Sequence, residues 1–424
     1  MGWSRFEVQA EAVALIKVCD GVGFRPRDRG VRKISMEMIL GGSDTCLAGM
    51  KIVDLSQFEA GPSCTEALAW MGAEVVKVEN PKGGDPMRGA HDDVYHHYQF
   101  LQYNANKRSV SVNLKDPKGL ALVKDLVRNA DVVVENFAPN TIERLGLGPD
   151  ELMKINPGLI YCKIKGFGEG SRFEHNLAFD MIAQACGGLM SITGDEDGSP
   201  CKPGASLGDT GTGMLLTISI LGAYVRKLRT GQGELLEIAM QDAILHYIRN
   251  AFTYMESSGK VAPRSGSRIV GGGCPPNGAY PCKGGGPNDF VYIYTSFANP
   301  EHWDRLLRIM GREDLVGDTR YDNNGRTERR AEVDALVSEW TRQQDKIAAM
   351  EILGEARIPA GAVMDTRELA DDETFIARGI RQTIQHPQSG EYTMSGWPVR
   401  FSGSTLPVTR APLLGEHNND VLER

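Results

Sequence analysis

The 424-residue sequence lacks several signals that would place it in a common class of protein. No uninterrupted apolar run reaches the roughly 18 residues that a membrane-spanning helix requires. Positive charge is in deficit, with 47 Lys and Arg against 55 Asp and Glu and a net charge of -8. This balance argues against nucleic acid as the main partner and leaves room for a local basic pocket. We therefore expect a cytoplasmic protein whose main partner is neither a membrane nor a nucleic acid.

The eight cysteines form no CxxC pair, and no His cluster completes a zinc-binding pattern. We therefore predict no metal site and expect reduced, mostly buried thiols. The chain also has no P-loop, no GxGxxG after a strand, no GxSxG and no HExxH. Cys64 follows Gly-Pro-Ser, but no His is placed to pair with it, which argues against a cysteine hydrolase.

From residue 50 onward the chain contains a regular alternation of strand-like and helix-like segments. The predicted strands are MKIVDLS, AEVVKVEN, DVVVENF and GLIYCKIKGFG, and helical segments such as GPSCTEALAWMG and GLALVKDLVRNA separate them. Repeated βαβ units predict an α/β fold with a large Rossmann-like parallel sheet and helices on both faces. Ligands of such sheets bind beyond the carboxyl ends of the strands, so the expected rim comprises SQFEAGPSCT, VENFAPN and KGFGEG.

Composition divides the chain further. A Gly- and Pro-rich stretch at 258–290 indicates a domain boundary or a mobile loop. Long helices are predicted over 212–229 and 330–354, and another follows the strand ELLEIA as far as Met255. The predicted parts are an extension foreign to the rest over 1–38, a large domain over 39–240, a smaller α/β domain over 265–365 and a C-terminal return to the large domain over 366–424.

The stretch KPGASLGDTGTGM at 202–214 places Asp209 among glycines just before a long apolar helix. Spacing alone leaves two interpretations open. As a structural residue, Asp209 caps the helix by accepting N–H bonds from Gly211 and Thr212. As a functional residue, it is a nucleophile that its small glycine neighbours make reachable and that the helix dipole keeps ionised.

Three further features are ambiguous in the same way. Asp180, in AFDMIAQACGG, precedes a predicted helix and is either its cap or a functional carboxylate. Glu59, in QFEAGPSCT, follows a strand and is either placed for a ligand or simply solvated. The segment VGGGCPP at 270–276 is either a linker or a lid that folds over a reactive intermediate.

The chain carries, in order, the motifs LAGMKIVDLSQFEAGPSCTEALAWMGAEVVKVENPKGGDPMR, NANKRSVSVNLKDPKG, DVVVENFAPNTIERLGLG, INPGLIYCKIKGFG, FDMIAQACGG, GDTGTGM, TGQGELLEIAMQDA and APLLGEHNNDVL. Over about residues 48–422 it resembles the class III CoA-transferases of the CaiB/BaiF type, which include formyl-CoA:oxalate CoA-transferase, the carnitine CoA-transferases and α-methylacyl-CoA racemase. The resemblance implies two α/β domains, the larger of which binds CoA, in an interlocked homodimer.

The resemblance also implies that Asp209 is a nucleophile, because it matches the aspartate of the GD that opens a helix in the transferases. This aspartate attacks an acyl-CoA to give a mixed anhydride, which CoA converts into an aspartyl-CoA thioester. CoA thioester is then a substrate, a small carboxylic acid is the acceptor, and no separate cofactor is expected. A glycine loop is expected to shield the anhydride from water. The implied catalytic residues are Asp209, Asp180, Glu59, Gly271, Gly272 and Gly273.

The CoA contacts that the resemblance implies fall on the predicted rim, at Asn136, Phe137, Arg144 and Lys165. The chain departs from the family at Asn80, where an Arg is frequent, so Lys82 or Arg88 is expected to take over a phosphate. Glu59 stands where formyl-CoA transferase has Gln. A second negative charge beside a dianion is unfavourable, which argues against oxalate as the acceptor.

Two alternatives remain. The racemases of this family carry His where this chain has Phe179, so the acid–base pair that racemisation requires is incomplete. A non-catalytic CoA-binding subunit would be expected to have lost the nucleophile, and Asp209 is present. The transferase is therefore preferred.

Overall fold

A six-stranded parallel sheet organises the larger part of the described chain, with the strand order β3-β2-β1-β4-β5-β6. The computed structural model describes residues 45–89, 94–404 and 408–422, so the predicted extension over 1–38 lies outside the described residues. The strands are β1 (Lys51–Asp54), β2 (Glu74–Glu79), β3 (Arg108–Ser111), β4 (Val132–Glu135), β5 (Ile160–Lys165) and β6 (Glu234–Ala239). The predicted α/β fold with a Rossmann-like sheet is confirmed.

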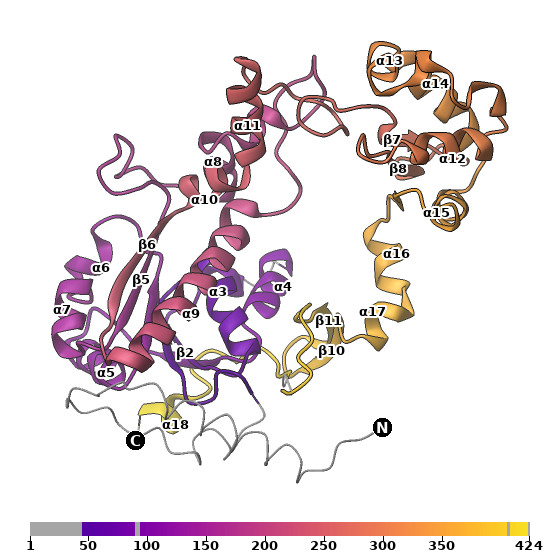
Figure 1. Ribbon diagram of the computed structural model, residues 1–424. Helices are drawn as coiled ribbons and strands as arrows, with labels where there is room; N and C mark the ends of the chain where they lie inside the picture. The colour runs from indigo at the N-terminus through magenta and orange to yellow at the C-terminus, as the bar shows by residue number, and fades with distance from the viewer. Residues whose placement is uncertain (1–44, 90–93, 405–407, 423–424) are drawn as a thin grey trace, which may run out of the picture. The chain divides into compact units, whose positions relative to one another are not determined.

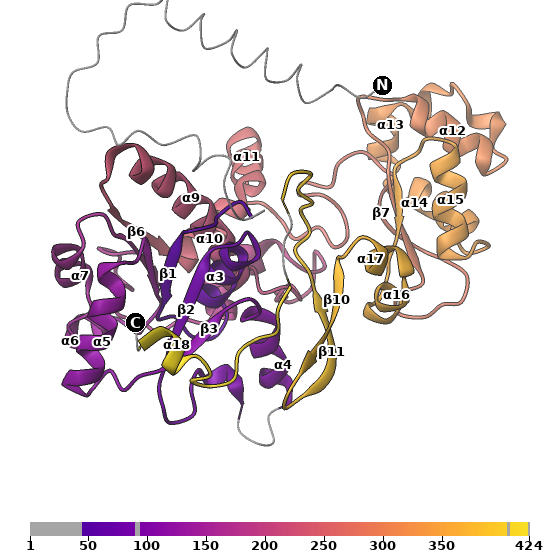
Figure 2. The ribbon, with the colours of Figure 1, turned by 90° about the horizontal axis from the view of Figure 1, so that it is seen from below.

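Alternate residues of the strands enter two hydrophobic cores, one on each face of the sheet. Val132 and Val134 pack on the side of α3, α9 and α10, whereas Val133 packs on the side of α5, α6 and α7. Both sides of β4 are therefore buried, and its first three residues are consecutive valines. Figures 1 and 2 show the two helix layers. Their bounds are α3 (Ala60–Trp70), α5 (Pro117–Arg128), α6 (Thr141–Arg144), α7 (Pro149–Ile155), α9 (Thr212–Thr230) and α10 (Met240–Tyr247).

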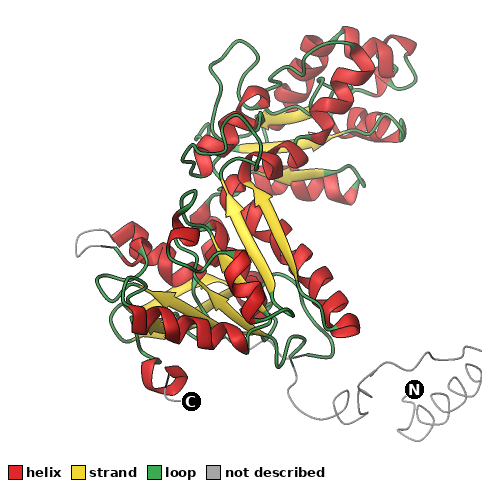
Figure 3. Ribbon diagram, turned by 90° about the vertical axis from the view of Figure 1, so that its left-hand side faces the viewer, coloured by secondary structure: helices red, strands yellow, loops and turns green. Residues whose placement is uncertain are grey.

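A smaller antiparallel sheet has a core of its own, which contains Val291, Trp303 and Leu353. Its strands are β7 (Asn277–Pro281), β8 (Phe290–Tyr294) and β9 (Ala360–Ala362), and they appear with their helices in Figure 3. The helices are α12 (Glu301–Ile309), α13 (Asn323–Glu328), α14 (Arg330–Thr341) and α15 (Lys346–Glu355). The domain boundaries near 265 and 365 stay predictions.

The C-terminal segment forms a hairpin and then reaches the edge of the large sheet. Strands β10 (Arg381–His386) and β11 (Gly390–Ser395) pair antiparallel. Further on, Asn418 Oδ1 accepts a hydrogen bond from the Ser111 amide of edge strand β3, at 2.8 Å. The remaining helices are α4 (Val94–Tyr103), α8 (Asp180–Cys186), α11 (Arg249–Ser258), α16 (Thr366–Asp371), α17 (Glu373–Ala377) and α18 (Asn418–Leu422).

Three predictions about local structure were wrong. The long helix after β6 is interrupted at Ile248, and the helix over 330–354 is two helices, the second of which Asp345 caps. The thiols are not mostly buried, because among the described cysteines Cys46, Cys186 and Cys201 are exposed. Within the part of the chain that the structure describes, no helix combines the length and apolar character needed to cross a bilayer.

Candidate active site

A cavity of about 190 Å³ opens at the carboxyl end of the parallel sheet. The strand order reverses between β1 and β4, and at such a point the loops that follow the two strands diverge and leave a crevice. All three rim segments predicted from the sequence contribute to it. The lining residues are Phe58, Ala60, Asn136, Phe137, Ala138, Pro139, Ile164, Lys165, Gly166, Asn176, Leu177, Ala178, Phe179, Asp209 and Met240.

Asp209 lines this cavity from a single π-helical turn, Leu207–Gly211, that leads into α9. Among the described residues, no group donates a hydrogen bond to its carboxylate. The interpretation of Asp209 as a helix cap is therefore wrong, because the wide turn places the residue inside the helical path and not ahead of it. Single π-turns are frequent at functional sites.

The glycines beside Asp209 allow neighbouring helices to pack closely against the turn. This corrects the expectation that they make the carboxylate accessible to a substrate. A Cβ on Gly208 would lie 2.7 Å from the carbonyl oxygen of Asp180. A Cβ on Gly211 would lie 2.8 Å from the Tyr247 ring, and one on Gly213 would lie 2.4 Å from a side-chain oxygen of α3. The small residues thus let α8, α10 and α3 approach the turn.

Asp180 fixes the turn from α8. It is the first residue of that helix, and its side chain does not cap it, so the cap interpretation is wrong here too. The carboxylate accepts hydrogen bonds from the Gly208 backbone N–H at 2.9 Å and from the Gln184 side-chain amide at 2.8 Å. It also pairs with Lys202 at 3.1 Å. Asp180 therefore holds the residue immediately before Asp209.

Glu59 fixes the turn from the other side. It precedes α3, it is 5 % exposed, and its carboxylate accepts the Thr210 hydroxyl at 2.6 Å. Burial raises the pKa of Glu59, and the hydroxyls of Thr210, Tyr103 and Ser206 partly offset that effect. The interpretation of Glu59 as simply solvated is wrong.

The electrostatic setting of Asp209 differs from the one expected of a helix start. Burial raises the pKa of Asp209 to about 8, the charges of Glu59 and Asp180 add to the shift, and Lys202 opposes it. A dipole was expected to keep this carboxylate ionised, but a carboxylate removed from water beside two others is unstable. Acylation would remove its negative charge from the cluster.

The turn also offers fewer amide donors than a free helix start. The Gly208 N–H is bound by Asp180, the Thr210 N–H donates to the Ser206 carbonyl at 2.9 Å, and the Thr212 N–H donates to the carbonyl of Asp209. These three N–H groups are therefore already occupied and are not free to stabilise an oxyanion.

Comparison with known proteins identifies the family. The family model described as CoA-transferase family III matches residues 47–418. The chain belongs to CoA-transferase family III. It is 37 % identical over 391 residues to a formyl-CoA:oxalate CoA-transferase of Streptomyces coelicolor, covering 88 % of this chain and 94 % of that one. A relative of the same name from Afipia carboxidovorans is 35 % identical over 398 residues, with 89 % and 92 % covered.

A solved structure supports the same assignment. A CaiB/BaiF family protein from Brucella suis superposes with a TM-score of 0.78 at 31 % identity, covering 89 % of this chain and 99 % of that one. The protein is therefore a CoA-transferase, as the sequence motifs predicted.

Three of the residues predicted to contact CoA in this CoA-transferase line the cavity. The Asn136 side chain accepts a hydrogen bond from the Gln57 backbone N–H at 2.8 Å and donates one to the Gln57 carbonyl at 2.7 Å. These two bonds connect the loop after β4 to the loop after β1. The Lys165 ammonium pairs with Glu135 at 2.8 Å and donates to the Phe137 carbonyl at 2.8 Å. Both side chains are thus already held by protein groups.

Other predicted residues lie outside the cavity lining of the described chain. Arg144 is exposed on α6, and Lys82 is exposed in the loop after β2. Arg88 pairs with Glu79 at 2.6 Å and lies over the Phe100 ring at 3.9 Å, so its charge is already paired within the protein. Its expected role as a phosphate ligand stays a prediction.

The glycine loop has the backbone expected of a glycine-specific segment, with φ of +81°, +85° and +53° at Gly271, Gly272 and Gly273. Arg330 donates to the carbonyls of Gly272 and Gly273, and Asn277 donates to that of Gly272 at 2.8 Å. The loop does not line the cavity of Asp209. Its proposed role as a lid stays a prediction.

Phe179, the residue that argues against a racemase, lines the cavity and packs edge-on against Phe58, with ring centroids 5.6 Å apart. Sequence reasoning did not select Phe58, Thr210 or Tyr103. Thr210 could have been noticed, because it adjoins Asp209 and can bridge to a neighbouring element. The contacts of Phe58 and Tyr103 depend on tertiary packing, for which the sequence holds no local signal.

Proposed function

We propose that this CoA-transferase moves CoA from an acyl-CoA donor to a carboxylic acid through covalent intermediates on Asp209. One observation carries the proposal: the carboxylate that lines the switch-point cavity has no hydrogen-bonding partner in the described chain, although the residues on both sides of it are tied to other elements. An interlocked homodimer forms part of the proposal.

The chemistry balances without another reactant. Asp209 attacks the thioester carbonyl, and CoA leaves as a thiolate, giving a mixed anhydride. The thiolate attacks the Asp209 carbonyl carbon and expels the donor acid as a carboxylate, which leaves an aspartyl-CoA thioester. The acceptor carboxylate displaces the thiolate again, and the thiolate then attacks the acceptor's carbonyl and regenerates Asp209. Covalent catalysis thus divides one difficult exchange into easier steps.

Trapping with hydroxylamine tests the proposal directly. Protein incubated with an acyl-CoA and no acceptor, then with hydroxylamine, should carry a hydroxamate in the peptide that contains Asp209, as detected by mass spectrometry. The Asp180→Asn variant should label at the same residue more slowly, because it keeps the nucleophile and weakens the hold on Gly208. A hydroxamate on Asp180 or Glu59 instead would reject the assignment.

The pH profile should report the ionisation of the nucleophile. Because burial and neighbouring carboxylates raise the pKa of Asp209 to about 8, kcat/KM should rise with pH and level off only above about pH 8. The Glu59→Gln variant removes one adjacent negative charge and should shift this rise of kcat/KM to lower pH. A profile that is flat between pH 6 and pH 9 would contradict the expected ionisation.

The charges around Asp209 also limit the acceptor. The curated relatives are named for formyl-CoA and oxalate, whereas Glu59 and Asp180 adjoin the proposed nucleophile here. Like charges brought together cost several kcal/mol, so a monocarboxylic acid should exceed oxalate in kcat/KM by at least about tenfold. Measuring formyl-, acetyl- and succinyl-CoA against both acceptors checks this, and Glu59→Gln should reduce the difference. Preference for oxalate in the wild type would contradict it.

A further inference from the structure

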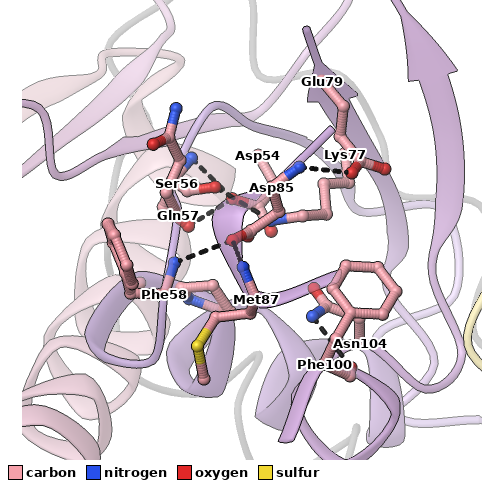
Figure 4. A network of polar contacts seen from close by, with 12 residues as sticks. Asp54, Ser56, Gln57, Phe58, Lys77, Glu79, Asp85, Met87, Phe100 and Asn104 are labelled. Carbon is pink, nitrogen blue, oxygen red and sulfur yellow. Dashed lines mark hydrogen bonds and ion pairs between the residues drawn. The ribbon is translucent and has the colours of Figure 1, made fainter. Parts of the chain in front are cut away.

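The turn between β1 and α3 is fixed at successive residues by hydrogen bonds to side chains, most of which come from other parts of the chain (Figure 4). Ser56 donates its amide to Asp54 at 2.9 Å, and its carbonyl accepts the Lys77 ammonium at 2.9 Å. The Gln57 peptide groups are held by Asn136. The Phe58 amide donates to Asp85 Oδ1 at 3.2 Å.

Phe58 is the residue of this turn that most needs such support. Its φ is +62°, in the left-handed region that a side chain with a Cβ adopts only at an energetic cost. This conformation directs the chain so that the Phe58 ring meets Phe179 and the next residue, Glu59, meets Thr210. The turn therefore sets two contacts that adjoin Asp209.

Asp85 connects this strained turn to two other elements. It is 2 % exposed and does not line the cavity. Its Oδ1 also accepts the Met87 amide at 3.0 Å, and its Oδ2 pairs with Lys77 at 2.8 Å. Lys77, on β2, is completely buried. A single carboxylate thus holds Phe58, a 3₁₀ turn and a sheet strand in one arrangement.

We propose that Asp85 is a positioning residue for the transferase reaction, which acts through the left-handed Phe58 to place Glu59 and the Phe58–Phe179 wall beside Asp209. The proposal rests on the proposed function of Asp209. Asp85 touches no reacting atom, and its effect is to maintain the arrangement in which the nucleophile is acylated.

A matched pair of double variants separates this role from the buried charge. Asp85→Ala alone would leave the Lys77 ammonium unpaired in the interior and is expected to impair folding. Lys77→Met with Asp85→Asn removes both charges and keeps an amide oxygen for the Phe58 N–H. Lys77→Met with Asp85→Ala removes both charges and that acceptor. The two proteins differ only in the side-chain oxygen that accepts the Phe58 and Met87 amides.

The double variant with Asp85→Ala should label with hydroxylamine at least about tenfold more slowly than the double variant with Asp85→Asn. Its kcat should fall by a matching factor, and its KM for acyl-CoA should stay unchanged. In this variant, kcat/KM should also begin to rise at a lower pH, because Glu59 is displaced from Asp209 while Asp180 and Lys202 stay in place. Circular dichroism at the assay temperature confirms that both proteins are folded.

Equal labelling rates and the same pH dependence of kcat/KM in the two double variants would overturn the positioning role. That result differs from failure of the proposed function, in which the wild type itself would give no hydroxamate at Asp209. If Lys77→Met prevents folding in both, Lys77→Gln replaces it in the same two double variants, because its neutral amide keeps a donor for the Ser56 carbonyl. The same difference in labelling rate is then expected, and equal rates would overturn the proposal.

Discussion

The Asp209→Asn variant is expected to fold, to bind CoA and to lose at least roughly 10³-fold in kcat, the scale on which an enzyme responds to loss of its nucleophile. The substitution keeps the shape of the side chain in the cavity, but an amide cannot form the mixed anhydride. Steady-state kinetics with saturating acyl-CoA measures the loss, and calorimetric titration with CoA measures the binding that should remain.

Stability separates this loss from misfolding. The folded protein raises the pKa of Asp209 to about 8, so between about pH 4 and pH 8 it retains a proton that the unfolded chain releases. Because the unfolded chain releases this proton and the folded protein keeps it, the free energy of unfolding falls as pH rises through this window. The melting temperature of Asp209→Asn should exceed that of the wild type at pH 8 and approach it near pH 4. An active Asp209→Asn protein would refute the assignment of Asp209 as the nucleophile.

The second large effect is on stability. Replacing Lys107 by Met should reduce the free energy of unfolding at pH 7 by about 3–5 kcal/mol, because a buried ion pair loses one partner. Lys107 pairs with Asp54 at 3.1 Å, and neither side chain is exposed. Burial alone would raise the pKa of Asp54, yet Lys107 and Lys77 hold it well below its ordinary value. Without Lys107, this interior carboxylate is poorly compensated.

The matched control is Lys154→Met on α7. Lys154 pairs with Glu151 at 3.4 Å on the surface, with the Lys154 side chain 73 % exposed, so the change should stay within about 0.5 kcal/mol. Urea denaturation of the two variants compares the pairs directly. Adding Asp54→Asn to Lys107→Met should restore part of the loss, and equal effects of the two single variants would exclude a special role for the buried pair.

The sequence predicted the strands that contain apolar runs, including ELLEIA at the far edge of the sheet. The segment DVVVENF begins with three consecutive valines after the aspartate, and β4 was found there. Strand β3 was missed because RSVS contains a single large apolar residue and lies at the edge of the sheet. The hairpin β10–β11 was missed because alternating polar residues such as Thr383 and Thr393 face outward. Strands without an apolar run depend on pairing partners that a local sequence pattern does not specify.

The site was predictable in location but not in its internal geometry. The rule that ligands bind beyond the carboxyl ends of parallel strands placed the segments after β1, β4 and β5 correctly. The family motif selected Asp209, Asp180 and Glu59, and the structure brings the three near one another. The π-turn and the left-handed Phe58 were not predictable, because each is stabilised by groups distant in sequence, such as Asp180 for Gly208 and Asp85 for Phe58.

The protonation of Asp209 makes it chemically distinguishable from the acids of the protein surface. Carbodiimides add to a carboxylic acid and not to its anion, and ordinary surface carboxyls are ionised at neutral pH. Asp209 retains its proton there and lines a cavity together with the aromatic side chains of Phe58 and Phe179. A hydrophobic carbodiimide should therefore modify this residue selectively, and bound acyl-CoA should protect it. The extent of modification would then count the competent active sites in a preparation, independently of any knowledge of the physiological acids.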